Sequence, residues 1–153
     1  MKEFKHFING EYVGSASGRT FENRCPLDNN LIGQVHEAGQ KEVDAAVKAA
    51  RAAMKGPWGK MTVTERVELL NKVADRINER FDEFLQAECL DTGKPYSIAR
   101  HIDIPRGAAN FRIFADVIKS VPTESFKLDT PDGQGALNFG VRKPKGVIAV
   151  ISP

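Results

Sequence analysis

The stretch "GVIAVIS" at residues 146–152 decides the fold class. Residues 147–151 are apolar without interruption and mostly β-branched. Such a run is typical of a strand buried on both faces of a parallel sheet, and parallel neighbours need crossover helices. The stretch therefore predicts an α/β protein. Because the chain stops at Pro153, where that sheet should begin, we expect it to be the front portion of a longer protein. A domain that closes this sheet with earlier strands is the alternative.

Four segments before this stretch predict amphipathic helices, because apolar residues recur in them at helical spacing. Thr62 and Glu65 match a capping box at the start of the second segment. Gly93 predicts the end of the third. The four segments begin at Gln40, Thr62, Phe81 and Asp103.

The first forty residues predict β-structure instead. Asn9-Gly10 lies between two short apolar-rich arms, which is the strongest short-range signal for a hairpin. The segments "RTFENR" (19–24) and "LIGQVH" (31–36) predict two further strands. Near the C-terminus, "LNFGVRK" (137–143) predicts one more strand within a polar, turn-rich region.

Composition excludes several classes of function. The chain has 153 residues, 41% of them hydrophobic, and a net charge of +2. This charge is too small to indicate binding to nucleic acid or to an anionic membrane. The longest apolar stretch is too short to span a bilayer, and the N-terminus lacks the apolar core of a signal peptide. We therefore expect a cytoplasmic protein.

The residues that could perform chemistry do not form a complete catalytic set. His6, His36 and His101 are scattered and lack the spacing of metal ligands. Cys89 belongs to a predicted amphipathic helix, where a small buried apolar residue is its ordinary role. Cys25 has no cation-rich setting that would activate a thiolate. No glycine-rich phosphate-binding motif is present.

Arg106 is a positively charged residue in a position where a helix favours negative charge. Asp103 is a predicted N-cap, and Pro105 suits the first turn of the helix that follows. Arg106 then falls in that first turn, where the helix macrodipole favours negative charge. Two interpretations stay open: an anionic ligand, or a solvated surface arginine paired with Asp103 or another carboxylate. Arg112 lies about 120° away in projection, so we expect it to make a structural contact.

Five segments of the sequence resemble the N-terminal part of the NAD(P)-dependent aldehyde dehydrogenase superfamily, in the family's order. They are "FINGEYV" (7–13), "VDAAVKAARAAMKGPWGKMTVTERVELLNKVADRI" (43–77), "ECLDTGKPYSIA" (88–99), "FRIFAD" (111–116) and "RKPKGVIAVISP" (142–153). The segment "NRCPLDNN" (23–30) departs from the turn that many relatives have, which puts only the local loop in doubt.

Within this superfamily, three segments resemble the branch that oxidises 2-hydroxymuconic semialdehyde in the meta-cleavage catabolism of aromatic compounds. They are "AECLDTGKP" (87–95), "HIDIPRGAANF" (101–111) and "VRKPKGVIAVISP" (141–153). The resemblance implies the N-terminal hairpin and helical region of the aldehyde dehydrogenase fold, ending at the first strand of the dinucleotide-binding sheet. It divides the chain into part of the cofactor-binding domain (1–125), an oligomerisation arm (126–145) and that first strand (146–153).

The resemblance also implies an activity and its partners. The whole protein is expected to be an oxidoreductase that converts an anionic semialdehyde to the dicarboxylate with NAD, as a homo-oligomer (dimer or tetramer). The nucleophilic cysteine and the general base would lie beyond Pro153, so we expect the 153-residue chain alone to be inactive. The choice between 2-hydroxy- and 2-aminomuconic semialdehyde, and between NAD and NADP, stays open. The alternative is a truncated, non-catalytic association module.

Individual residues take roles from the same resemblance. Arg106 is expected to grip the substrate's distal carboxylate, because a guanidinium can form two parallel charge-assisted hydrogen bonds with it. Ile151, Ser152 and Pro153 are expected to begin the cofactor-contacting segment. Asp91, together with carbonyl groups near residues 23 and 24, is expected to bind a monovalent cation; the alternative is a solvated aspartate at the C-terminal end of a helix.

Overall fold

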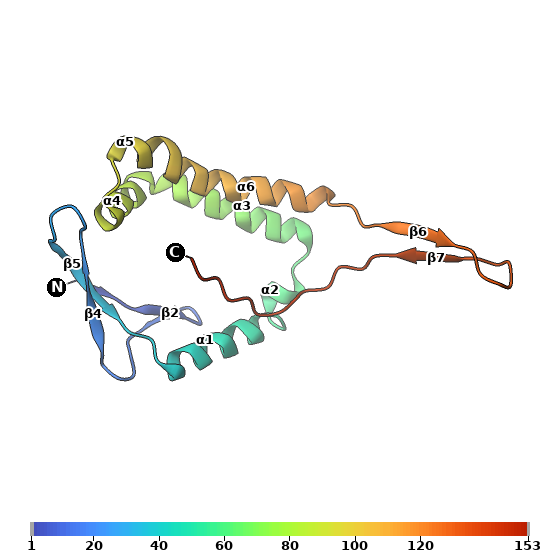
Figure 1. The fold of residues 1–153 in the computed structure, drawn as a ribbon, viewed down its shortest axis with the longest axis horizontal. Coiled ribbons are helices and arrows are strands. Elements are labelled where there is room, and N and C mark those ends of the chain that lie inside the picture. Colours follow the sequence, from blue (N-terminus) through green and yellow to red (C-terminus); the bar gives the residue numbers. More distant parts are fainter. Residues whose placement is uncertain (1, 153) are drawn as a thin grey trace.

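The computed structural model describes residues 2–152, which form an elongated α/β arrangement (Figure 1). Short strands gather near the N-terminus, long helices extend from them, and a hairpin projects at the opposite end. The mixed α/β class expected from the sequence is therefore confirmed. No helix among the described residues is long and apolar enough to cross a membrane.

The larger sheet has three strands: β1 (Glu3–Phe4), β4 (Thr20–Arg24) and β5 (Leu31–His36). Strand β5 lies in the middle, antiparallel to β4 and parallel to β1. Gly33 permits the approach of β1, because a Cβ atom at this position would lie 2.6 Å from the Lys2 carbonyl oxygen. The predictions for β4 and β5 are confirmed, whereas the two-residue strand β1 was missed.

The predicted N-terminal hairpin is confirmed. Strands β2 (His6–Ile8) and β3 (Glu11–Val13) pair in antiparallel fashion around Asn9 and Gly10. Asn9 has φ 53° and Gly10 has φ 86°. Positive φ at both central residues is what a two-residue hairpin turn requires, and the Asn-Gly pair supplies it at low steric cost.

Helix α1 (Gln40–Ala53) is fixed to the preceding loop by Glu42. The Glu42 carboxylate accepts hydrogen bonds from the Gly39 and Ala16 backbone N–H groups at 2.7 and 2.9 Å. The Glu42 side chain is buried. The hydrogen bond from Gly39, and after it the one from Ala16, hold the pKa of Glu42 below its ordinary value. A depressed pKa means that Glu42 stabilises the fold above the unfolded glutamate pKa. This stabilisation is lost as the pH falls through the lower folded value.

Glu42→Gln is therefore expected to lower the midpoint temperature of unfolding at neutral pH and to flatten its decline on acidification. An amide has one acceptor oxygen in place of two, so a backbone N–H group would be left unpaired. Thermal unfolding followed by circular dichroism between neutral and acidic pH tests this. Asp44→Asn, an exposed acid-to-amide change on the same helix, is the control. Equal pH dependence in the two variants would contradict the assignment.

The start of one predicted helix and the end of another lie where the sequence indicates. After the short helix α2 (Pro57–Lys60), helix α3 (Val63–Glu79) starts at the Thr62 capping box, with both reciprocal hydrogen bonds present. Helix α4 (Phe81–Thr92) ends at Gly93, which is left-handed with φ 73°.

The prediction that the fourth helix begins at Asp103 is wrong. A helical run starts directly after Pro95 with α5 (Tyr96–Ile98), passes through the π-helical turn η1 (Ala99–Asp103) and continues as α6 (Ile104–Ser120). Asp103 has right-handed helical angles and its side chain caps nothing. The Ile104 N–H group donates to the Ala99 carbonyl, which is the wide spacing of a π turn. Pro105 is accommodated directly after this turn.

The helices pack through small residues and one apolar cluster. Figure 1 shows α3 and α6 lying side by side and running in opposite directions. Ala74 on α3 and Ala108 and Ala115 on α6 are almost completely buried, which allows the two helices to approach closely. A second cluster joins α4 to the π turn. It consists of Leu85, Cys89, Ala99 and Ile104, with Ile77 and Phe81 against it. The interpretation of Cys89 as a buried apolar residue is confirmed.

Strands β6 (Ser125–Leu128) and β7 (Ala136–Phe139) form the projecting hairpin (Figure 1). Only β7 was predicted, and it ends at Phe139, earlier than the "LNFGVRK" segment suggested. The large side chains of this hairpin are exposed.

Residues 147–151 form no strand within residues 2–152, so their place as the first strand of a dinucleotide-binding sheet stays a prediction. The alternative in which they close a sheet with earlier strands is also not observed. The segment runs back past α2, and Gly146 lies near the Met54 sulfur. A strand is stabilised by pairing, and residues 2–152 offer this segment no partner. Ile151 is 94% exposed as a result.

Candidate functional site

Arg106 lies on the exposed face of α6. At about 100° per residue it points roughly 200° away from Ile104 and from Ala108, which are both buried. Because the helical run begins at Tyr96, Arg106 is not in its first turn. The prediction that Arg106 lies in the first turn of a helix, at the positive end of the macrodipole, is therefore wrong. The exposed position itself follows from the helical period.

Within residues 2–152, Arg106 makes no ion pair or side-chain hydrogen bond. The alternative that Arg106 pairs with Asp103 is not observed, because the Asp103 carboxylate pairs with the Lys94 ammonium group.

Exposed apolar side chains form a stripe on α6 two turns beyond Arg106 on the same face, with the exposed Asn110 in between. Ile113 and Val117 lie within about 20° of Arg106 in projection, and Phe114 is beside them. All three are at least half exposed. A guanidinium on the same face as an apolar stripe suits a ligand with an apolar body and one anionic end.

Arg112 has the structural contact expected for it. Its Nη2 atom donates to Asp75 Oδ1 at 2.5 Å, which joins α6 to α3. Arg106 has no such ion pair with α3 within residues 2–152.

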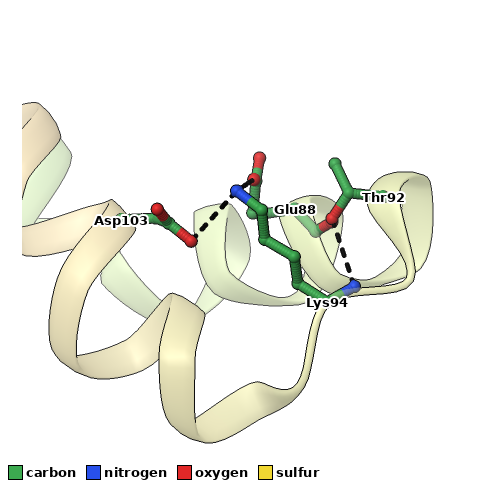
Figure 2. Close-up of polar contacts among 4 residues, drawn as sticks. All are labelled: Glu88, Thr92, Lys94 and Asp103. Carbon is green, nitrogen blue, oxygen red and sulfur yellow. Dashed lines mark hydrogen bonds and ion pairs between the residues drawn. The ribbon is translucent and has the colours of Figure 1, made fainter.

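Lys94, which sequence reasoning passed over, bridges α4 and the π turn (Figure 2). Its Nζ atom lies 2.9 Å from Glu88 Oε1 and 3.1 Å from Asp103 Oδ2. The Thr92 hydroxyl accepts a hydrogen bond from the Lys94 backbone N–H at 3.3 Å. The hydrogen bonds to Glu88 and Asp103 raise the pKa of Lys94 above its ordinary value. No local spacing rule links Lys94 to Asp103, so the sequence offered no signal for this contact.

The cation prediction combines Asp91 with carbonyl groups near residues 23 and 24, and the structure brings the side chains of Asp91 and Asn23 together. The Asn23 side-chain amide donates to Asp91 Oδ1 at 2.6 Å, between β4 and the end of α4. Both residues line a cavity of about 440 Å³ whose other walls are mainly apolar. Hard cations take several oxygen ligands. The described residues contain no cluster of three or more acidic, histidine or cysteine side chains. The amide donor also competes for one Asp91 oxygen. A cation at Asp91 stays a prediction.

The expected cofactor segment is incomplete in the described part of the chain. Ile151 and Ser152 are exposed and belong to no strand, and Pro153 lies outside the described residues. A dinucleotide binds at the carboxyl ends of several parallel strands, and residues 2–152 do not form such an edge. These residues alone therefore do not fit a dinucleotide. Their cofactor-binding role stays a prediction.

Comparison with known proteins assigns the family. The family model described as "Aldehyde dehydrogenase family" matches residues 12–153. Over its whole length the chain is 70% identical to a 2-hydroxymuconic semialdehyde dehydrogenase of Pseudomonas sp. (strain CF600), of which it covers 32%. It is 48% identical to a 2-aminomuconic 6-semialdehyde dehydrogenase of Pseudomonas sp., covering 31% of that protein. The chain thus spans about a third of the length of these relatives.

A solved structure agrees with this assignment. The NAD+ complex of an aldehyde dehydrogenase from Bacillus cereus matches with a TM-score of 0.78 and 42% identity. The match covers 82% of this chain and 26% of that one. From the family match and these likenesses we conclude that the chain belongs to the aldehyde dehydrogenase family.

Proposed function

We propose that this chain is part of an enzyme that oxidises 2-hydroxymuconic semialdehyde to the dicarboxylate with NAD. The supporting observation is the 70% identity, over the whole chain, to a dehydrogenase named for that substrate. The lower identity of 48% to a 2-aminomuconic 6-semialdehyde dehydrogenase favours the hydroxy substrate over the amino one. When bound, NAD supplies the acceptor for the hydride that leaves the aldehyde.

In this proposal Arg106 binds the carboxylate at the end of the substrate remote from the aldehyde. Three features of the described structure support this role: the exposure of Arg106, the lack of a carboxylate partner within residues 2–152, and the apolar stripe two turns beyond it on the same face. The guanidinium would hold the anion while the apolar side chains of α6 flank the carbon chain. Binding at a remote group orients the reacting end of a substrate.

Kinetic measurement on the complete protein tests the proposed activity. We expect formation of NADH with 2-hydroxymuconic semialdehyde, and a lower kcat/KM with an uncharged aldehyde of similar length. The same assay with NADP and with 2-aminomuconic semialdehyde establishes the cofactor and substrate preference. Absence of NADH formation by a folded, complete protein would refute the proposal.

A non-catalytic association module of the same fold is the second candidate. The exposed apolar side chains of the β6–β7 hairpin favour it, because such a hairpin can pair with another chain. The mass of the native subunit separates the two candidates. A subunit several times heavier than 16.9 kDa supports the enzyme, and a subunit of that mass supports the module.

Assembly and setting follow from the same proposal. We propose that the complete enzyme is a homo-oligomer, with residues 126–145 as an arm between subunits. Exposed apolar residues on both strands of the hairpin support this. We also place the enzyme in the cytoplasm, in the catabolism of aromatic compounds.

A further inference from the structure

We propose that Lys94 sets the enzyme's selectivity for anionic aldehydes by occupying Asp103, which would otherwise pair with Arg106. This inference rests on the substrate-binding role of Arg106 in the proposed function. Lys94 is thus a positioning residue: it is not placed against the substrate, and it keeps a neighbouring carboxylate away from the residue that is.

Asp103 is the carboxylate best placed to compete for Arg106. The two residues are three positions apart, and side chains at this spacing lie next to each other on a helix surface. An Asp–Arg pair at this spacing is a common and favourable contact. In the structure, however, the Asp103 carboxylate turns to Lys94, with Oδ2 at 3.1 Å from Nζ (Figure 2).

Glu88 holds the Lys94 ammonium group where it can pair with Asp103. Its Oε1 atom lies 2.9 Å from Nζ, so the ammonium is fixed between a carboxylate of α4 and one of the π turn. All three side chains are partly exposed. Lysine is protonated at neutral pH at its ordinary pKa, and the hydrogen bonds to the two carboxylates raise the pKa of Lys94 further. A permanently charged lysine is therefore available to neutralise Asp103.

Removal of Lys94 would leave two carboxylates without their shared cation. Asp103 would then be free to take the Arg106 guanidinium, and the substrate carboxylate would have to displace it. Competition from a partly exposed ion pair is modest, so we expect an effect of about two- to fivefold. The effect should appear in KM rather than kcat, because it acts on binding of the remote carboxylate.

The test is the ratio of kcat/KM for 2-hydroxymuconic semialdehyde to that for an uncharged aldehyde of similar length, in the complete enzyme. Lys94→Gln is expected to lower this ratio by about two- to fivefold, mainly through KM. The double variant Lys94→Gln/Asp103→Asn is expected to recover it, because the competing carboxylate is gone. A role of Lys94 in the fold alone would predict no recovery. Lys94→Arg, which keeps the charge, should retain the ratio.

Two further variants keep the inference testable if Lys94→Gln does not fold. Asp103→Asn alone is expected to keep or raise the ratio, and a fall in the ratio would overturn the inference. In an Arg106→Ala background, Lys94→Gln should change the ratio no further, because both act through one group. Arg100→Gln is the control. It removes a different ion pair between the π turn and α4, in which Arg100 Nη1 lies 3.7 Å from Asp82 Oδ1, and it should leave the ratio unchanged.

The two proposals fail in different ways. A wild-type enzyme that does not oxidise the semialdehyde refutes the proposed function. A wild-type enzyme that does, with a Lys94→Gln ratio unchanged or a double variant that does not recover, overturns the role of Lys94.

Discussion

Arg106→Ala is expected to lower kcat/KM for the anionic semialdehyde by about ten- to a hundredfold. A charge-assisted hydrogen bond to a bound ligand is worth about 1.5–3 kcal/mol, which corresponds to that range. Arg106 is suited to this contact because it is exposed on α6 and has no carboxylate partner within residues 2–152. Steady-state kinetics of the complete enzyme with both substrates measures the effect.

The uncharged aldehyde of similar length is the internal control for this substitution. Its kcat/KM should change little, because it has no carboxylate for Arg106 to bind. Arg106→Lys should recover only part of the loss, since it keeps the charge but not the bidentate geometry. If Arg106→Ala slowed both substrates by the same factor, the residue would support the helix, and its anion-binding role would be wrong.

Leu85→Ala is expected to cost about 2–5 kcal/mol of unfolding free energy, the largest stability effect among these predictions. Leu85 is 1% exposed and belongs, with Cys89 and Ile104, to the cluster that joins α4 to the π turn. Truncation would leave a cavity that the surrounding helices can fill only in part. The urea concentration at the midpoint of unfolding gives the change.

Leu90→Ala is the matched control for Leu85→Ala. It removes the same atoms from the same helix, but Leu90 is 48% exposed in the described structure. Its expected cost is smaller, since less apolar surface returns to water. Equal shifts of the midpoint for the two variants would show that the α4 cluster is not a core of the fold.

Local signals were enough to predict much of this structure. The Asn9-Gly10 turn, the Thr62 capping box and the Gly93 helix end each depend on residues a few positions apart, and each is confirmed. The exposed face on which Arg106 lies likewise follows from the helical period. A single sequence contains these relationships directly.

Non-local pairing accounts for what was missed or wrong. Strand β1 has two residues and exists because it pairs with β5, some thirty positions away. Residues 147–151 have the composition of a buried strand but no partner within residues 2–152. Asp103 has the residue type of an N-cap, yet Lys94 takes its carboxylate and the helix runs through it. In each case the outcome depends on a partner outside the local segment, which is present for β1 and Asp103 and missing from the described chain for residues 147–151.

The π turn before Arg106 has a consequence for how substrate preference can evolve. A π turn contains one residue more than an α-helix needs, so losing a single codon within residues 99–103 would let the ladder close as α-helix. Arg106 would then rotate by about 100° relative to α4 without any substitution in the site. Pro105 opposes this step, because proline inside an α-helix clashes with the carbonyl of the preceding turn. A lineage that drops the extra residue would therefore have to replace Pro105 as well, so a deletion in this turn cannot redirect Arg106 in one step, whereas substitution of Arg106 itself can remove the proposed charge preference.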